Sequence, residues 1–383
     1  MEYIIIIILL LFCAIKYDGD YKDNSKLYWL VCFGLILFVG LRYRIGGDSM
    51  IYMDNFKYEK KLQNLTMNDF MDSKYAPLWV IFSSFCKTLF NDFTALQLIH
   101  SFFVNIVIFW FFKKHLKFKF TAVLFYFYLY YLYYNTEVLR AAVATAFFLL
   151  SYDYYKNGKW LQYYILSIIA FLFHFQAVVL FLLPLTIFLR KISFNVYSII
   201  LLVIIAVSVQ FAFNFVPIIK EAVSDFEHTL YLVEYYSEGR SIYNSNLNGI
   251  IMHIIYQIPY LYLLWYNRNS KDKEMYCIFV AFIIFSFMGL SLSTIMNRSK
   301  DLLGPVLIVV MARSLEPISK HINLKYLSII SVVLILFWKI DYYIFAERYK
   351  LWYPYSSVFD NNNERDKEHE KYLMRIDELS APK

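Results

Sequence analysis

Runs of apolar residues follow one another along almost the whole chain, and they constrain the fold more than any other feature. Many of them approach the roughly 20 residues that an α-helix needs to cross a bilayer. Of the 383 residues, 60% are hydrophobic and only 17% are charged, against about 25% charged residues in an ordinary soluble domain. The sequence therefore predicts an all-α, polytopic integral membrane protein.

Lysine and arginine orient the spans, because short cytoplasmic loops carry an excess of both. Five basic loops alternate consistently and are predicted to be cytoplasmic: 113–119, 156–159, 190–191, 268–273 and 313–325. The apolar segment 77–90 carries Ser83, Ser84 and Lys87 near its middle. Polar groups are costly at the bilayer centre, so this segment is predicted to be re-entrant or interfacial.

About 12 full spans remain on the length rule, and they define the predicted domains. Residues 1–345 form a transmembrane domain, with loops 42–75 and 216–246 on the outer face. Residues 346–383 form a polar, partly disordered tail, because they offer little to bury.

The segment RYRIGGDSMIY, residues 42–52, directly follows an apolar helix. Arg42 and Arg44 supply fixed positive charge, a glycine pair supplies a flexible turn, and Asp48 supplies a carboxylate. This composition suits the capture of a lipid phosphate at the membrane surface, and Asp48 is a candidate base. The alternative is that the arginines reach lipid headgroups and the glycines form an ordinary turn.

A second polar group lies at Asn135, Thr136, Glu137 and Arg140. Asn135 or Thr136 is predicted to cap the following helix, and Glu137 and Arg140 share one face of its first turn. Arg140 can grip two phosphate oxygens at once, and Glu137 is a second candidate base. Alternatively, the two side chains simply neutralise each other.

Three further residues are predicted on the outer face. His174, at the turn between two apolar segments, titrates near neutrality and is a third candidate base, although a lone histidine is also a common packing residue. Arg298, in a predicted loop at 297–300, and Arg240, among tyrosines in the long loop, are candidate phosphate ligands. No cysteine pair or metal-binding spacing occurs in the sequence, so we expect no metal and no cofactor.

Three segments, in this order, resemble the EpsG family of exopolysaccharide proteins. They are RYRIGGDSMIYMDNF (42–56), NTEVLRAAVATAFFLLSYDYYKNGKW (135–160) and AFLFHFQAVVLFLLPL (170–185). Two positions depart from the family pattern: Ala141 stands where glutamine often follows the helix arginine, and Gly47 stands where threonine often precedes the aspartate.

The resemblance implies a Wzy-type polymerase of the bacterial inner membrane, with its active site on the periplasmic or outer face. Such a glycosyltransferase joins oligosaccharide repeat units carried on undecaprenyl pyrophosphate into surface polysaccharide, such as capsule or O-antigen. In that reaction Arg42, Arg140 and Arg298, with Arg44 and Arg240 behind them, would stabilise the departing pyrophosphate. Membrane lipid and other assembly proteins, such as a flippase and a chain-length regulator, are the implied partners.

Two other classes stay open from the sequence. A flippase for lipid-linked sugar should carry charges deep in several spans, whereas the ionisable residues here crowd at one face. A membrane acyltransferase would need a histidine near a cytoplasmic acyl donor, whereas His174 is predicted outside. Nucleic acid is not an expected partner, because the chain has no basic soluble domain to hold it.

Overall fold

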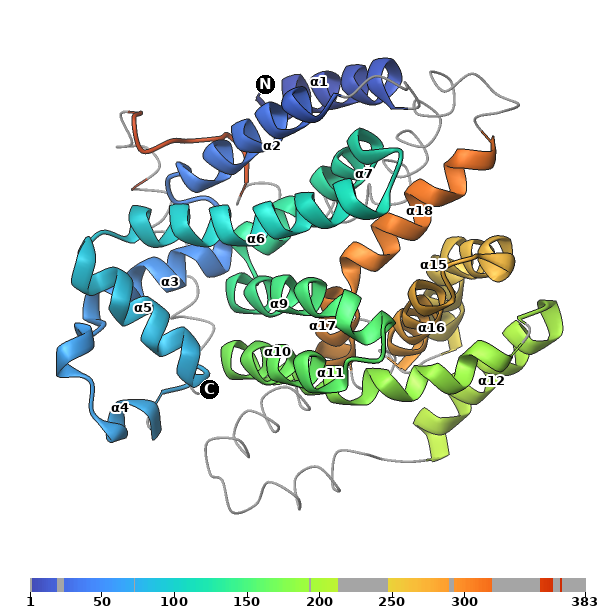
Figure 1. Ribbon diagram of the computed structural model, residues 1–383. Helices are drawn as coiled ribbons and strands as arrows, with labels where there is room; N and C mark the ends of the chain where they lie inside the picture. The colour runs from blue at the N-terminus through green and yellow to red at the C-terminus, as the bar shows by residue number, and fades with distance from the viewer. Residues whose placement is uncertain are drawn as a thin grey trace. The chain divides into compact units, whose positions relative to one another are not determined.

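The computed structural model describes residues 2–18, 24–71, 73–192, 194–212, 247–288, 293–318, 352–360 and 366. Within these residues the secondary structure is helical, apart from one isolated antiparallel bridge between Arg42 and Ser357. The chain forms two compact units, and Figure 1 shows their helices coloured by position along the chain. Unit 1 contains residues 1–66, 79–146 and 319–383, and unit 2 contains residues 67–78 and 147–318.

The helices of unit 1 form two antiparallel pairs and the site that lies at their ends. They are α1 (Glu2–Tyr17), α2 (Ser25–Gly40), α3 (Gly47–Tyr58), η1 (Leu62–Asn64), most of α5 (Pro77–Leu89), α6 (Phe93–His115), α7 (Lys119–Tyr126), η2 (Phe127–Tyr131), α8 (Leu132–Thr136) and the first part of α9 (Leu139–Lys156). The most extensive packing is between α2 and α6 and between α1 and α7.

The α2 and α6 helices run antiparallel. Near one end the Tyr28 hydroxyl donates to the Phe109 carbonyl (2.7 Å), and at the other the Gln97 amide donates to the Arg42 carbonyl (3.1 Å). The start of α6 is capped by Asp92, whose carboxylate accepts from the Thr94 N–H (2.9 Å). Three basic residues in its last turn suit the negative end of the helix dipole.

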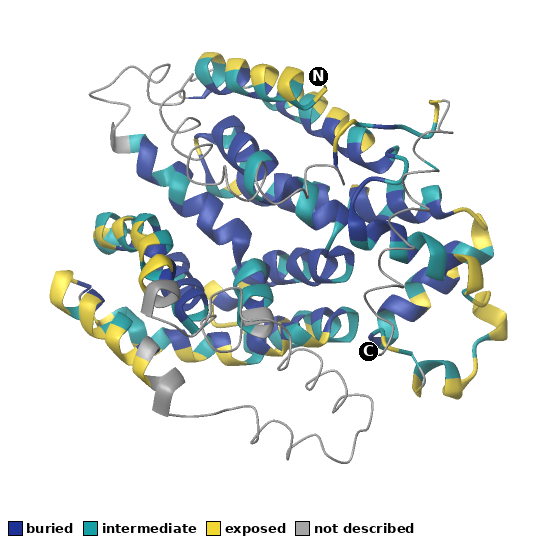
Figure 2. Cartoon of the chain, turned by 180° about the vertical axis from the view of Figure 1, so that it is seen from behind, coloured by how far each residue is buried: buried dark blue, intermediate teal, exposed yellow. Residues whose placement is uncertain are grey.

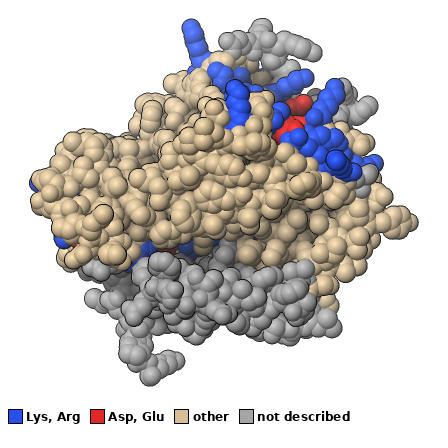
Figure 3. Space-filling view, turned by 60° about the horizontal axis from the view of Figure 1, so that its bottom comes forward, with Lys and Arg blue, Asp and Glu red and all other residues tan. Residues whose placement is uncertain are grey.

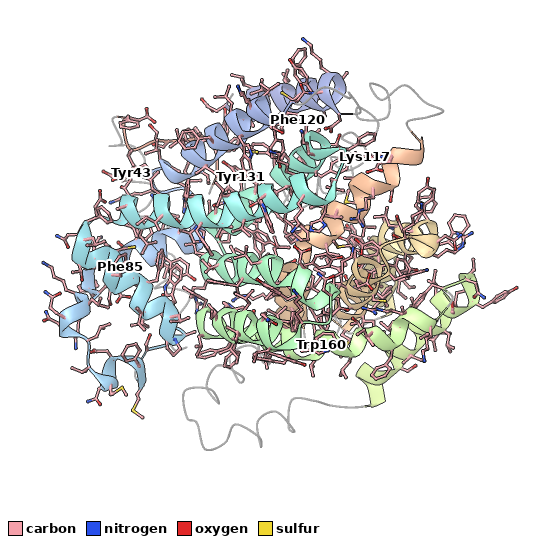
Figure 4. The ribbon with its side chains drawn as sticks, in the orientation of Figure 1. Tyr43, Phe85, Lys117, Phe120, Tyr131 and Trp160 are labelled. Atoms are coloured by element: carbon pink, nitrogen blue, oxygen red, sulfur yellow. The ribbon has the colours of Figure 1, made fainter. Side chains whose placement is uncertain are left out.

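The helix that begins at α7 returns the chain to the end of α2 near Arg42. Asp18, after α1, caps α7 by accepting from the Phe120 and Thr121 N–H groups (3.0 and 2.6 Å). The chain then passes through the π-helical turn η2 into α8 without leaving the helix. Phe120 and Tyr131, labelled in Figure 4, come from α7 and η2. The Tyr131 hydroxyl donates to the Leu35 carbonyl and so fixes the π turn against α2.

Unit 2 contains the remaining helices. They are α4 (Met67–Met71), the rest of α9, α10 (Trp160–Phe173), η3 (Phe175–Val178), α11 (Val179–Leu182), η4 (Leu183–Lys191), α12 (Val196–Ala212), α15 (Leu247–Tyr266), η5 (Asn267–Asn269), α16 (Lys273–Met288), α17 (Ser293–Leu302) and α18 (Gly304–Ile318). The α16 helix is the core of this unit, since it packs against η4, α12, α15, α17 and α18.

Four of the predicted cytoplasmic loops meet in unit 2. The Asp272 carboxylate accepts from the Tyr152 hydroxyl (2.9 Å), Lys156 Nζ (3.2 Å) and Arg313 Nη1 (3.0 Å). Beside it along the chain, Glu274 pairs with an arginine of the 190–191 loop (3.0 Å). These contacts tie the ends of α9, η4 and α18 to the start of α16.

The described helices carry large apolar side chains on their outer surfaces. Exposed residues include Ile5 and Ile8 of α1 and Ile200 and Leu201 of α12 (Figure 2). On the face drawn in Figure 3, residues other than Lys, Arg, Asp and Glu cover broad areas of the described surface. This surface is typical of a protein that lies in lipid.

The all-helical class is confirmed for the described residues, but the predicted count of about 12 spans is not. Within the ranges described, α6 is the one helix that is long and apolar enough to cross a membrane, with 23 residues. The α2, α5 and α10 helices and the segment Val196–Ala206 are apolar but shorter. The return helix 119–136 is divided by its π turn, and the outer loop 216–246 lies outside the described residues.

Candidate functional site

Arg42 joins the end of α2 to the beginning of α3. Its guanidinium donates from Nη1 to the Val39 carbonyl (2.7 Å) and from Nη2 to the Ser49 hydroxyl (3.0 Å). The side chain is only 1% exposed. Arg42 therefore holds the loop 42–47 in shape, and its predicted contact with a substrate stays a prediction.

Arg44 lies in the same loop and has a left-handed backbone conformation, with a φ of +49°. Its Nη1 forms an ion pair with the carboxylate of Asp366 (2.9 Å), which also accepts from the hydroxyl of Tyr43 (2.9 Å). Tyr43 is labelled in Figure 4 just beyond α2. A carboxylate of the chain thus lies where the sequence predicts an anionic substrate group.

Glu137 occupies the amino-terminal end of α3. Its Oε1 accepts from the Gly47 N–H (2.9 Å) and its Oε2 accepts from the Asp48 N–H (3.2 Å). These N–H groups have no partner within the helix, and the helix dipole favours a negative charge there. Asp48, predicted in a loop, lies in the first turn of α3 and is half-buried. The structure brings these two candidate bases together.

Gly46 makes this close approach possible. Its φ is +91°, a conformation that residues with side chains rarely adopt. A Cβ atom on Gly46 would lie 2.3 Å from Thr136 Cβ and 2.9 Å from Glu137 Oε1. The absence of a side chain at this position therefore lets the end of α8 pack directly on the start of α3.

Burial and the neighbouring Asp48 carboxylate raise the pKa of Glu137 to about 6, against 4.5 for an ordinary glutamate. The hydrogen bonds from the α3 backbone oppose this rise. A carboxylate with a pKa near 6 is mostly ionised at neutral pH and still basic enough to take a proton. Glu137 therefore has the properties that a general base needs.

Arg140, in the first turn of α9, is held by α3 as well. Its Nε donates to the Tyr52 hydroxyl (2.8 Å), and its guanidinium lies 5.9 Å from the centre of the Tyr52 ring. The ring of Tyr52 packs in turn on Trp79 of α5, with centroids 5.4 Å apart. Arg140 itself is half-buried, so its guanidinium is both oriented and accessible.

Two details of this region differ from the sequence prediction. Asn135 and Thr136 do not cap α9, because they form the end of α8 and their side chains donate back to the carbonyls of Tyr131 (2.7 Å) and Leu132 (2.8 Å). Glu137 precedes α9 and turns toward α3 instead of sharing the first turn of α9 with Arg140. The two residues that the sequence predicts as the cap of α9 therefore form the last turn of α8.

His174 and Arg298 belong to unit 2. His174 ends α10, is 7% exposed, and its Nδ1 accepts from the Gln176 N–H (3.2 Å). Residues 297–300 are predicted as a loop but lie in α17, which packs against η3 just after His174. The structure therefore brings the elements of His174 and Arg298 together, and Arg240 lies outside the described residues.

Three residues that shape the site are not predicted from the sequence: Tyr52, Thr136 as a hydrogen-bonding group, and Trp352. Tyr52 is four residues after Asp48, so a helix through 47–58 would place both on related faces. No sequence signal points to Trp352, because its partner Thr136 is far away in the chain. Within the part of the chain that the structure describes, no three metal-ligating side chains lie together.

The profile of one known family matches residues 25–357 of the chain, which include every residue of the site described above except Asp366. It is the EpsG family. The chain belongs to the EpsG family. This family is associated with the polymerisation of exopolysaccharide in membranes. No curated protein and no solved structure matches the chain.

Proposed function

We propose that this EpsG-family protein is a glycosyltransferase of the bacterial inner membrane. It polymerises oligosaccharide repeat units carried on undecaprenyl pyrophosphate, in the manner of Wzy-type enzymes, at the face away from the cytoplasm. The observation that carries the proposal is that α3 holds both residues, Glu137 through the N–H groups of its first turn and Arg140 through the Tyr52 hydroxyl. The two residues supply a base and an anion-stabilising group for one transfer reaction.

In the proposed reaction a hydroxyl oxygen of the acceptor sugar attacks the anomeric carbon of the growing chain. The bond between that carbon and the pyrophosphate oxygen breaks, and its electron pair leaves with the lipid pyrophosphate. The hydroxyl proton passes to Glu137, with Asp48 and His174 as the other candidate acceptors. Arg140 stabilises the negative charge that develops on the leaving group, with Arg298, Arg42, Arg44 and Arg240 as further candidates.

Contacts between the predicted cytoplasmic loops of unit 2 support the proposed orientation. In unit 2, Lys156 and Arg313 both form ion pairs with Asp272, and the three residues come from three predicted cytoplasmic loops. In unit 1, Tyr3 near the amino terminus donates to the Trp352 carbonyl (2.7 Å), beside the site loop. This contact supports a position for the start of α1 on the same face as residues 42–75.

Deletion of the gene, followed by gel analysis of surface polysaccharide, tests the function. A polymerase mutant should lose long chains and keep material with a single repeat. A flippase mutant should instead accumulate lipid-linked units inside the cell. An acyltransferase mutant should keep chains of normal length that lack acyl groups. Either of the last two outcomes would replace the proposal.

Arg140→Lys tests the part assigned to Arg140. Lysine keeps the charge but lacks the planar fork that binds two phosphate oxygens and donates to Tyr52. We expect a loss of polymer of about tenfold or more, since each 1.4 kcal/mol of transition-state stabilisation is a factor of ten. Polymer yield should be compared at equal protein abundance. Wild-type polymer from the lysine variant would remove Arg140 from the site.

A further inference from the structure

The carboxy-terminal segment Trp352–Val358 pairs with the site loop. The Tyr43 N–H donates to the Ser356 carbonyl (2.8 Å) and the Val358 N–H donates to the Leu41 carbonyl (2.9 Å). These two bonds enclose the bridge between Arg42 and Ser357. The segment is therefore paired, through this one bridge, with the loop that leads into α3.

Aromatic side chains secure the same segment on α2. The Tyr355 ring stacks on Phe38, with centroids 4.2 Å apart, and its hydroxyl donates to the Phe38 carbonyl (2.7 Å). Trp352 is 4% exposed, and the Tyr3 hydroxyl donates to its carbonyl. The sequence assigns these residues to a polar tail, yet they are packed within unit 1. The family match ends at residue 357, so all of this packed segment except Val358 lies within the matched range.

Trp352 reaches the candidate base through one hydroxyl group. Its indole Nε1 donates to Thr136 Oγ1 (3.0 Å). The Thr136 hydroxyl lies 2.8 Å from the Leu132 carbonyl and 3.3 Å from Glu137 Oε1. A hydroxyl has one proton to donate and can also accept. Because the indole N–H occupies the acceptor side, it orients the hydroxyl toward these two oxygens.

We propose that the segment Trp352–Val358 is a structural part of the site, and that Trp352 is a positioning residue that holds the Glu137 carboxylate through Thr136. The assignment of a catalytic role to this carboxylate rests on the proposed function, whereas the linkage itself rests on the contacts. Trp352 keeps the hydroxyl of Thr136 beside Glu137, and the pairing of the segment with residues 41–43 holds the loop that leads into α3.

Loss of the indole N–H should change the proton affinity of Glu137. Without that donor the Thr136 hydroxyl keeps its bond to the Leu132 carbonyl but is no longer directed toward Glu137, and the ionised carboxylate loses support. The charged groups near Glu137 on the neighbouring elements are Asp48 of α3, Arg42 of the preceding loop and Arg140 of α9. None of these groups is altered by Trp352→Phe, so a change can be assigned to the donor.

The test measures the modification of Glu137 by a hydrophobic carbodiimide, which reacts with protonated carboxyl groups, across a pH series. Peptide mass spectrometry reads the extent of labelling in the full-length protein in detergent. Trp352→Phe should raise the labelling midpoint by about 0.5 pH unit, a fraction of the shift that a direct charged contact produces. The matched control, Tyr353→Phe, changes a neighbouring residue that is 50% exposed and should leave the midpoint unchanged.

Thr136→Val removes the hydroxyl that links Trp352 to Glu137, so it tests the same linkage if the Trp352 variant is poorly folded. It should raise the midpoint at least as far, and the double variant should shift no further than Thr136→Val alone. A midpoint that stays at the wild-type value in Trp352→Phe or in Thr136→Val would overturn the linkage. Because labelling needs no turnover, a wild-type protein that makes no polymer would contradict the proposed function and leave the linkage to be decided by this measurement.

Discussion

Gly46→Ala is the change that most directly probes how the site is assembled. The backbone at Gly46, with φ +91° and ψ 143°, lies in a region that is almost restricted to glycine. A side chain there costs about 1–3 kcal/mol of stability. The new methyl group would also overlap Thr136 Cβ at 2.3 Å. Moving Thr136 releases Glu137, and each lost charged hydrogen bond adds about 1.5–3 kcal/mol.

We therefore expect Gly46→Ala to lower the free energy of unfolding by about 3 kcal/mol or more on these two contributions together. Two matched variants separate the causes. Gly158 has a φ of +68° but nothing within 4 Å of its Cβ position, so Gly158→Ala should show backbone strain alone. Gly34 has open space and lies within α2, so Gly34→Ala should be neutral or slightly stabilising.

Denaturant unfolding of the purified protein, together with polymer yield, measures these differences. The expected order of destabilisation is Gly46→Ala, then Gly158→Ala, then Gly34→Ala, with loss of polymer in the first. If Gly46→Ala were no more destabilising than Gly158→Ala and made normal polymer, the loop would have relaxed around the methyl group. That result would show that the close approach of α8 and α3 does not hold Glu137 in place.

The remaining predictions concern the same site and the cytoplasmic cluster. Tyr52→Phe removes the hydroxyl that accepts from Arg140 and should slow polymerisation about tenfold. Tyr58→Phe changes an 87% exposed residue of the same helix and should leave the rate unchanged. Equal polymerisation rates in the two variants would remove Tyr52 from the site. Turnover should fall as the pH drops through about 6, because protonated Glu137 cannot accept a proton. As the pH falls over that range, the free energy of unfolding should rise, because the folded protein binds this proton more tightly than the unfolded chain does. Turnover and unfolding free energy that do not change with pH would contradict the raised pKa. Asp272→Asn should destabilise the protein by about 1–3 kcal/mol, measured by thermal unfolding. Burial alone would raise the pKa of Asp272, but its basic partners hold the pKa below 3.8, so the wild-type advantage should vanish only in strong acid.

Local patterns predicted much of the structure. The α10 helix begins and ends at the residues where the apolar run does, and the Arg42 and Arg140 segments do meet. Both results follow from composition, because apolar runs select helices and charged residues at their ends are excluded from lipid. The sequence therefore located the candidate site of unit 1 before its geometry was known.

The rest depended on contacts between distant residues. The sequence predicts that Glu137 and Arg140 share one face because they are three residues apart, but the Glu137 carboxylate instead accepts from the N–H groups in the first turn of α3. Residues 352–358 have the composition of a loop, and only their pairing with residues 41–43 gives them a fixed place. Such a pairing leaves no periodic signal in the sequence.

Reconstitution of the purified protein in liposomes, with undecaprenyl-pyrophosphate-linked repeat units as the sole substrate, tests the central claim most directly. Products should form a ladder of increasing repeat number, with one lipid pyrophosphate released for each new bond. Glu137→Gln, which keeps the shape of the side chain and removes its charge, should abolish the ladder. Substrate that crosses the bilayer unchanged in size, or a full ladder from Glu137→Gln, would contradict the account.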